Sequence, residues 1–178
     1  MKIVLSIIIL LFFSGCDREN KMPEYQLSRG EELVNSILAN AAKKIYKEYN
    51  IRPCGVGVSM PGGPIKEVTL CFDTKKPYTK MQLRISLIKL AQELLEQINE
   101  NNEIQEFLKE RPFTIKNVEI IIYNHDEKGL TLKDPQISVA GIAQGVLDYS
   151  SIDPEDGFRY KNEYEETYEE ALEIIEKS

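Results

Sequence analysis

The sequence predicts an α+β domain in which an antiparallel sheet of about four to six strands is packed on one face by a long central helix and by helices near both chain ends. Three observations predict it. Two long segments, 28–49 and 79–99, carry apolar residues at helical spacing. Residues 54–73 hold two short apolar runs around a turn signal, and residues 118–123 are rich in β-branched side chains, both typical of strands. A last helical pattern at 163–176 completes the order helix, hairpin, long helix, strands, helix.

The chain begins with an export signal. Lys2 provides a positive start, residues 3–13 are apolar except for one serine, and small residues precede Cys16. This layout predicts a signal peptide at 1–15 that is removed from the mature protein. The apolar run, about eleven residues long, is too short for a membrane-spanning helix, which needs about 20.

The segment Phe13-Ser14-Gly15-Cys16 resembles the lipobox of bacterial lipoproteins. The resemblance implies that Cys16 is linked to diacylglycerol, becomes the new N-terminus and is acylated there, so that the membrane is its first partner. Asp17 resembles the enteric signal that keeps lipoproteins on the periplasmic face of the inner membrane; the outer membrane and the cell surface are the alternatives. Residues 16–27 then form the lipidated cysteine and a polar tether of about 35 Å at most, and residues 28–178 form the domain.

Charge limits the class of partner. The net charge is −7, which disfavours nucleic acid as a partner. Residues 153–178 contain ten acidic and three basic residues, so they account for the whole net charge.

Two capping boxes mark where the long helices begin. Ser28 with Glu31 opens the first helix, and Asn50 is expected to end it. Thr79 with Gln82 opens the second, whose broad apolar arc predicts that it lies flat on the sheet. A short helical turn is expected after it, at Glu103 to Lys109.

The hairpin at 54–73 has two possible registers. A tight turn at Gly62-Gly63 sets Cys54 opposite Cys71, close enough for a cross-strand disulfide. A slip of one residue instead aligns Val56 and Val58 with apolar partners and sends the two cysteines to opposite faces. A β-bulge would satisfy both demands. Because paired thiols outside the cytoplasm rarely stay reduced, we predict a structural disulfide between the two cysteines.

The second half of the chain is predicted to be mainly strands. Residues 113–124 contain a central strand, 125–129 a turn, and 130–133 the start of a return strand. Residues 136–150 fit either a helix that begins at Asp134-Pro135 or a strand with bulges at its glycines, and we favour the strand.

The C-terminal segment is expected to hold a short edge strand at 158–161 and a helix at 163–176. The acidic face of this helix is a candidate docking site for an envelope protein with a basic surface, although a solvated face explains it equally well. Its residues are Glu165, Glu166, Glu169, Glu170 and Glu173.

No pattern indicates catalysis, a metal or a cofactor. His125, the only histidine, lies among polar residues of a turn and is not expected to bind a metal. The acidic turn at 153–157 lacks the ligand order of a calcium loop. No serine or cysteine lies in a nucleophile motif, and no phosphate-binding loop is present.

The function predicted from the sequence is therefore that of a membrane-anchored, non-enzymatic interaction or assembly module of the cell envelope. The alternative is a lipoprotein that binds a small ligand or lipid between the sheet and the long helix. A hydrolase that acts on envelope material through carboxylates is less expected.

Overall fold

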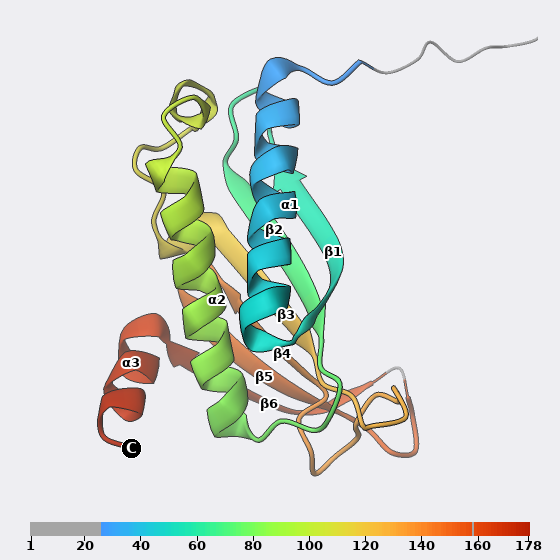
Figure 1. Ribbon diagram of the computed structural model, residues 1–178. Helices are drawn as coiled ribbons and strands as arrows, with labels where there is room; N and C mark the ends of the chain where they lie inside the picture. Colours follow the sequence, from blue (N-terminus) through green and yellow to red (C-terminus); the bar gives the residue numbers. More distant parts are fainter. Residues whose placement is uncertain (1–25, 158) are drawn as a thin grey trace, which may run out of the picture.

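Six strands form one sheet in the order β1-β2-β3-β4-β5-β6 (Figure 1). The computed structural model describes residues 26–157 and 159–178, so the predicted signal peptide and Cys16 lie outside the described residues. The strands are β1 Arg52–Ser59, β2 Glu67–Asp73, β3 Val118–Tyr123, β4 Val139–Ala143, β5 Val146–Ile152 and β6 Tyr160–Thr167. The helices within these residues are α1 Arg29–Tyr49, α2 Lys80–Glu100, α3 Tyr168–Glu176 and the short 3₁₀ helices η1 Ile104–Phe107 and η2 Ile115–Asn117.

The α+β class is confirmed, but the sheet is mixed. β2 and β3 run parallel, and every other neighbouring pair is antiparallel. The parallel pair arises because α2 carries the chain back across the sheet between these two strands. Two isolated bridges, Ile65 with Leu108 and His125 with Thr131, extend the pairing, and with them the sheet exceeds the predicted four to six strands.

Both predicted capping boxes are present. The hydroxyls of Ser28 and Thr79 accept hydrogen bonds from backbone N–H groups three residues on, and Glu31 and Gln82 return the bond to the cap. Asn50 ends α1 in the left-handed conformation, at φ 54°. The first two predicted helices are therefore confirmed.

The hydrophobic core lies between the sheet and the helices. Val68, Leu70 and Phe72 alternate along β2 with more exposed residues and are fully buried. Figure 1 shows α1 and α2 lying across the same face of the sheet, and α3 packs against α2 in the same layer. No helix of the described residues covers the opposite face, which is called the helix-free face below.

The first hairpin adopts the slipped register with a bulge. Val56 lies opposite Leu70, and the pairing shifts between Pro53 and Gly55. Cys54 is the extra residue of this bulge, and it and its predicted partner Cys71 are both free thiols here. The disulfide stays a prediction.

The strand interpretation of 136–150 is confirmed, but the segment is two strands rather than one bulged strand. Gln144 and Gly145 form the turn of the β4–β5 hairpin, with φ values of 52° and 80°. Positive φ at both positions is what a tight hairpin turn requires. The return strand expected at 130–133 is reduced to the bridge at Thr131.

The predicted C-terminal helix begins five residues too early. Residues 163–167 belong to β6, which pairs with β5 along its whole length. Thr167 then caps α3, and its hydroxyl accepts a hydrogen bond from the Glu170 N–H. Sheet pairing outweighs the weak helical pattern before this cap, because tertiary contacts override local propensity. The expected edge strand therefore runs on to Thr167.

Candidate functional site

The five glutamates predicted to form one helical face are divided between two elements. Glu165 and Glu166 lie on β6, whereas Glu169, Glu170 and Glu173 lie on α3. The five residues therefore do not form one helical face, and their role in docking stays a prediction. Four of the five nevertheless line one cavity of about 300 Å³ between β6 and α3. This edge groove is lined by Glu165, Glu166, Glu170, Glu173, Ile174 and Lys177.

Within the edge groove, Glu166 is already engaged. Its carboxylate accepts two hydrogen bonds from the Arg84 guanidinium, at 2.7 and 2.8 Å, and another from the Tyr149 hydroxyl. The Arg84 and Glu166 side chains are only 8% and 10% exposed. Although burial opposes ionisation, the bonds from Arg84 and Tyr149 hold the pKa of Glu166 below its usual range. Glu166 therefore ties β6 to α2 and β5.

The α3 carboxylates are partly engaged as well. Glu170 accepts the Thr167 backbone N–H at 2.7 Å, and this bond lowers the pKa of Glu170. Glu173 pairs with Lys177 at 3.0 Å on the exposed surface. Such exposed pairs are weak, so Glu173 remains able to exchange its partner.

A second group of carboxylates lies on the helix-free face. Asp148 of β5 stands directly opposite Glu165 of β6 and opposite Gly141 of β4. A Cβ at position 141 would lie 2.7 Å from the Asp148 Oδ1, so the aspartate occupies the space that the glycine leaves. Glu119 of β3 is near enough to act on Asp148 electrostatically. We call Glu119, Asp148 and Glu165 the carboxylate cluster.

The carboxylate cluster repels itself. Burial first, and then the charges of Glu165 and Glu119, raise the pKa of Asp148. None of the ion pairs among the described residues involves a member of the cluster. Glu119 only accepts a hydrogen bond from Thr69, at 2.7 Å. Because its carboxylates take part in none of these ion pairs, the cluster is a concentration of negative charge on the helix-free face. Like charges directly opposite each other also destabilise a sheet.

Glu119 and Asp148 are not among the site residues predicted from the sequence. Each is a single acidic residue within an apolar strand, in Val118-Glu119-Ile120 and in Leu147-Asp148-Tyr149. The alternation of side chains along a strand places such a residue on the face opposite the core. That signal was present, but it did not show that the two strands are close in the sheet.

The cysteines lie near one end of the helix-free face. Asp73 pairs with Arg52 at 2.6 Å and lies 3.7 Å from the His125 Nδ1. Burial first, and then the charge of Asp73, raise the pKa of Cys54 to about 12, so its thiol stays protonated at neutral pH. No group of three or more His, Cys, Asp or Glu side chains within the described residues is arranged to hold a metal ion.

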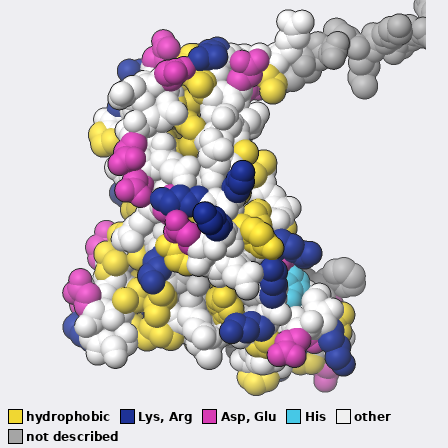
Figure 2. All heavy atoms as spheres, in the orientation of Figure 1, with side chains coloured by type: hydrophobic (Ala, Val, Ile, Leu, Met, Phe, Trp, Pro, Cys, Tyr) yellow, Lys and Arg dark blue, Asp and Glu magenta, His cyan; other side chains and the backbone are white. Residues whose placement is uncertain are grey.

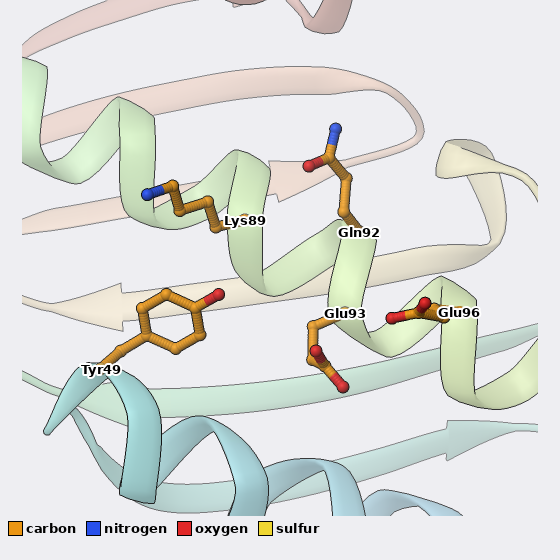
Figure 3. Close-up of a pocket in the computed structure, with 5 residues that line it drawn as sticks. All are labelled: Tyr49, Lys89, Gln92, Glu93 and Glu96. Atoms are coloured by element: carbon orange, nitrogen blue, oxygen red, sulfur yellow. The ribbon is translucent and has the colours of Figure 1, made fainter.

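A polar cavity of about 390 Å³ lies between α1 and α2. Figure 3 shows Tyr49 reaching from α1 toward α2, which supplies the other residues of this helix groove. The lining residues are Tyr49, Lys89, Gln92, Glu93 and Glu96. Glu93 is held there by Lys44 at 2.8 Å and by Gln97 at 2.7 Å. Figure 2 shows basic and acidic side chains together on this side of the molecule, so its charges are mixed.

No protein-family model, no curated protein and no solved structure matches this chain. In the part of the chain that the structure describes, none of the helices has the length and apolar character needed to span a bilayer.

Proposed function

We propose that this chain is a lipid-anchored protein of the cell envelope that acts as a non-enzymatic interaction module and binds a basic envelope protein with its helix-free face. The observation that carries the proposal is the carboxylate cluster on the helix-free face, whose three members take part in none of the ion pairs among the described residues. A basic partner would neutralise this charge, because complementary potentials guide association and fix the register of an interface.

The surroundings of the cluster suit a protein partner. Val146 of β5, two residues from Asp148, is 38% exposed, and Tyr160 of β6 and Tyr123 of β3, toward the other end of the same face, are 51% and 36% exposed. Aromatic and aliphatic side chains beside a charged patch are typical of protein interfaces.

The location of this module rests on the N-terminal segment. The resemblance of Phe13-Ser14-Gly15-Cys16 to a lipobox supports a lipid anchor, and the short tether would hold the domain within about 35 Å of the membrane. A partner would therefore be a membrane protein or a protein that works close to the same membrane.

A ligand-binding function has less support. It requires a deep, mostly apolar pocket between the sheet and the long helix. The α2 side chains Leu87, Leu90 and Leu94, which face the sheet, are fully buried in the core. The helix groove lies between the two helices instead, and its lining is polar.

Site-specific photo-crosslinking in intact cells tests the proposal. A photoreactive amino acid at Val146 on the helix-free face should give one dominant adduct with a protein, whereas the same amino acid at Lys47 on α1 should not. The adduct should disappear in the variant Glu119→Gln/Asp148→Asn/Glu165→Gln and persist in the control Glu96→Gln. Equal adducts from both positions, or an adduct that survives loss of the cluster, would overturn the proposal.

A further inference from the structure

One edge of β6 is open. β6 is the last strand of the sheet, and among the described residues it pairs with β5 alone. Along an antiparallel strand, residues whose backbone N–H and C=O groups bond to the neighbouring strand alternate with residues whose backbone groups point away from it. The residues that point away carry backbone groups able to pair with a further strand.

Two hydrogen bonds identify those residues. The Tyr168 N–H donates to the Gly145 carbonyl at 3.0 Å. The backbone N–H and C=O groups of Tyr168, and of every second residue before it, therefore point toward β5. The Ser150 carbonyl accepts the Ser138 N–H at 2.8 Å on the far side of β5, so the residue opposite Ser150 is not bonded to β5. That residue is Glu163.

The backbone groups of Glu163 and Glu165 therefore point to the open edge. Thr167, the next residue in this alternation, agrees with the assignment, because its N–H is taken by the Glu170 carboxylate rather than by β5. The chain thus presents two consecutive pairs of N–H and C=O groups that another strand can use.

The charges around this edge select the occupant. The side chain of Glu165 belongs to the carboxylate cluster on one side of the sheet, and Glu163 lies on the same side and raises the pKa of Asp148 further. On the other side, Glu170 and Glu173 line the edge groove beside Ile174, which is 37% exposed. A strand added here would meet carboxylates with both of its faces.

We propose that an extended basic segment of the partner protein adds to the sheet beside β6, pairing with the backbone of Glu163 and Glu165 and placing lysine or arginine side chains against the acidic groups on both faces. Main-chain bonds supply affinity in such strand addition, and side chains supply specificity. A second copy of β6 is disfavoured as the occupant, because its glutamates would face those of the first. This inference rests on the proposed function and specifies how the partner is recognised.

Synthetic peptides test the inference on the mature, lipid-modified chain in detergent. The probe is a seven-residue peptide in which adjacent pairs of lysines are separated by threonine or valine, so that lysine side chains lie on both faces of the added strand. The first control carries N-methyl groups on alternate backbone nitrogens, which keeps the charge and removes the donors on one edge. The second control has glutamate in place of lysine.

The unmodified peptide should bind, and N-methylation should weaken it by about tenfold or more, as expected for two lost hydrogen bonds. Binding should slow hydrogen exchange of the Glu163 and Glu165 amides. The glutamate peptide should not bind. On the protein side, Glu165→Pro should weaken binding beyond Glu165→Ala, because proline removes the backbone donor and is tolerated on an edge strand.

Equal binding of the methylated and unmodified peptides, or no binding of either, would overturn strand addition. The proposed function is judged separately by the crosslink from Val146, so the two failures are distinguishable. A cluster-dependent crosslink together with equal peptide affinities would mean that the partner docks by charge on the helix-free face without adding a strand.

Discussion

Arg84 of α2 and Glu166 of β6 form a two-bond ion pair, at 2.7 and 2.8 Å, that joins the long helix to the edge strand. The two residues are 82 positions apart in the chain, and both side chains are almost fully buried. The Tyr149 hydroxyl completes the group, and Lys80 lies over the rings of Tyr149 and Tyr164, at 4.8 and 4.7 Å. This pair holds in place the strand on which both proposals depend.

Arg84→Met should destabilise the protein by about 3 kcal/mol or more, because it leaves a buried carboxylate without its partner. The pKa of Glu166 is depressed in the folded state, so its stabilising contribution is present above the ordinary glutamate pKa and is lost as the pH falls through the folded value. Urea unfolding at pH 7 and pH 3 measures this, and the cost of the substitution should be smaller at pH 3.

The double variant Arg84→Met/Glu166→Met is the matched control for that prediction. Removing both charges should recover most of the lost stability, since no unpaired charge remains. A double variant that is as unstable as Arg84→Met would mean that packing, rather than the ion pair, holds β6.

Asp148→Asn should stabilise the protein at neutral pH by about 0.5 kcal/mol, because it removes repulsion between directly opposite carboxylates. The pKa of Asp148 is raised in the folded state, so the wild type loses stability as the pH rises from the ordinary aspartate pKa through the folded value. The gain should therefore vanish below the ordinary pKa. Thermal unfolding against pH measures it, with Glu96→Gln as the control that lies outside the cluster.

The exported protein should contain a disulfide between Cys54 and Cys71. The bulge leaves Cys54 within electrostatic range of Cys71, and the loop that the bond would close has a length for which about 3 kcal/mol is expected. Intact-mass measurement before and after reduction checks the bond, and urea unfolding checks its effect. Cys54→Ser/Cys71→Ser should be insensitive to reductant. Two free thiols in protein taken directly from the envelope would contradict the prediction.

Cys16→Ser should move the protein from the membrane fraction to the soluble fraction, since a lipid anchor requires the thiol. Cell fractionation with immunoblotting measures the distribution, and metabolic labelling with a radioactive fatty acid measures the lipid. Cys54→Ser is the control, because it should leave both unchanged. Membrane attachment that persists in Cys16→Ser would contradict the lipoprotein interpretation.

Local signals account for what could be predicted of the fold. The capping residues Ser28 and Thr79 mark the helix starts, because a capping box depends only on two residues three positions apart. The hydroxyl accepts a hydrogen bond from the later residue's N–H, and the later side chain accepts one from the N–H of the cap. The Thr167 cap was equally visible, and with it the true start of α3 could have been found. Gly141 and Gly145 predict bulges rather than a hairpin, because a turn at Gln144-Gly145 needs a non-glycine residue at positive φ, which is uncommon.

The candidate site was predicted only in its composition. The acidic C-terminal segment was recognised, but its glutamates were assigned to one helix. Whether Glu165 and Glu166 lie on a helix or on opposite faces of a strand depends on β5, which supplies the pairing. Glu119 and Asp148 join the site from strands that no local pattern places side by side.

The sequence by itself determined the α+β class, the two long helices, the central strand and the prediction of a lipid anchor, because each depends on residues within a few positions of one another. Only the tertiary structure decided the parallel pairing of β2 with β3, the assignment of residues 163–167 to β6, the Arg84–Glu166 pair and the carboxylate cluster. These features bring together residues from distant parts of the chain, and long-range packing rather than local propensity selects among the pairings that the sequence permits.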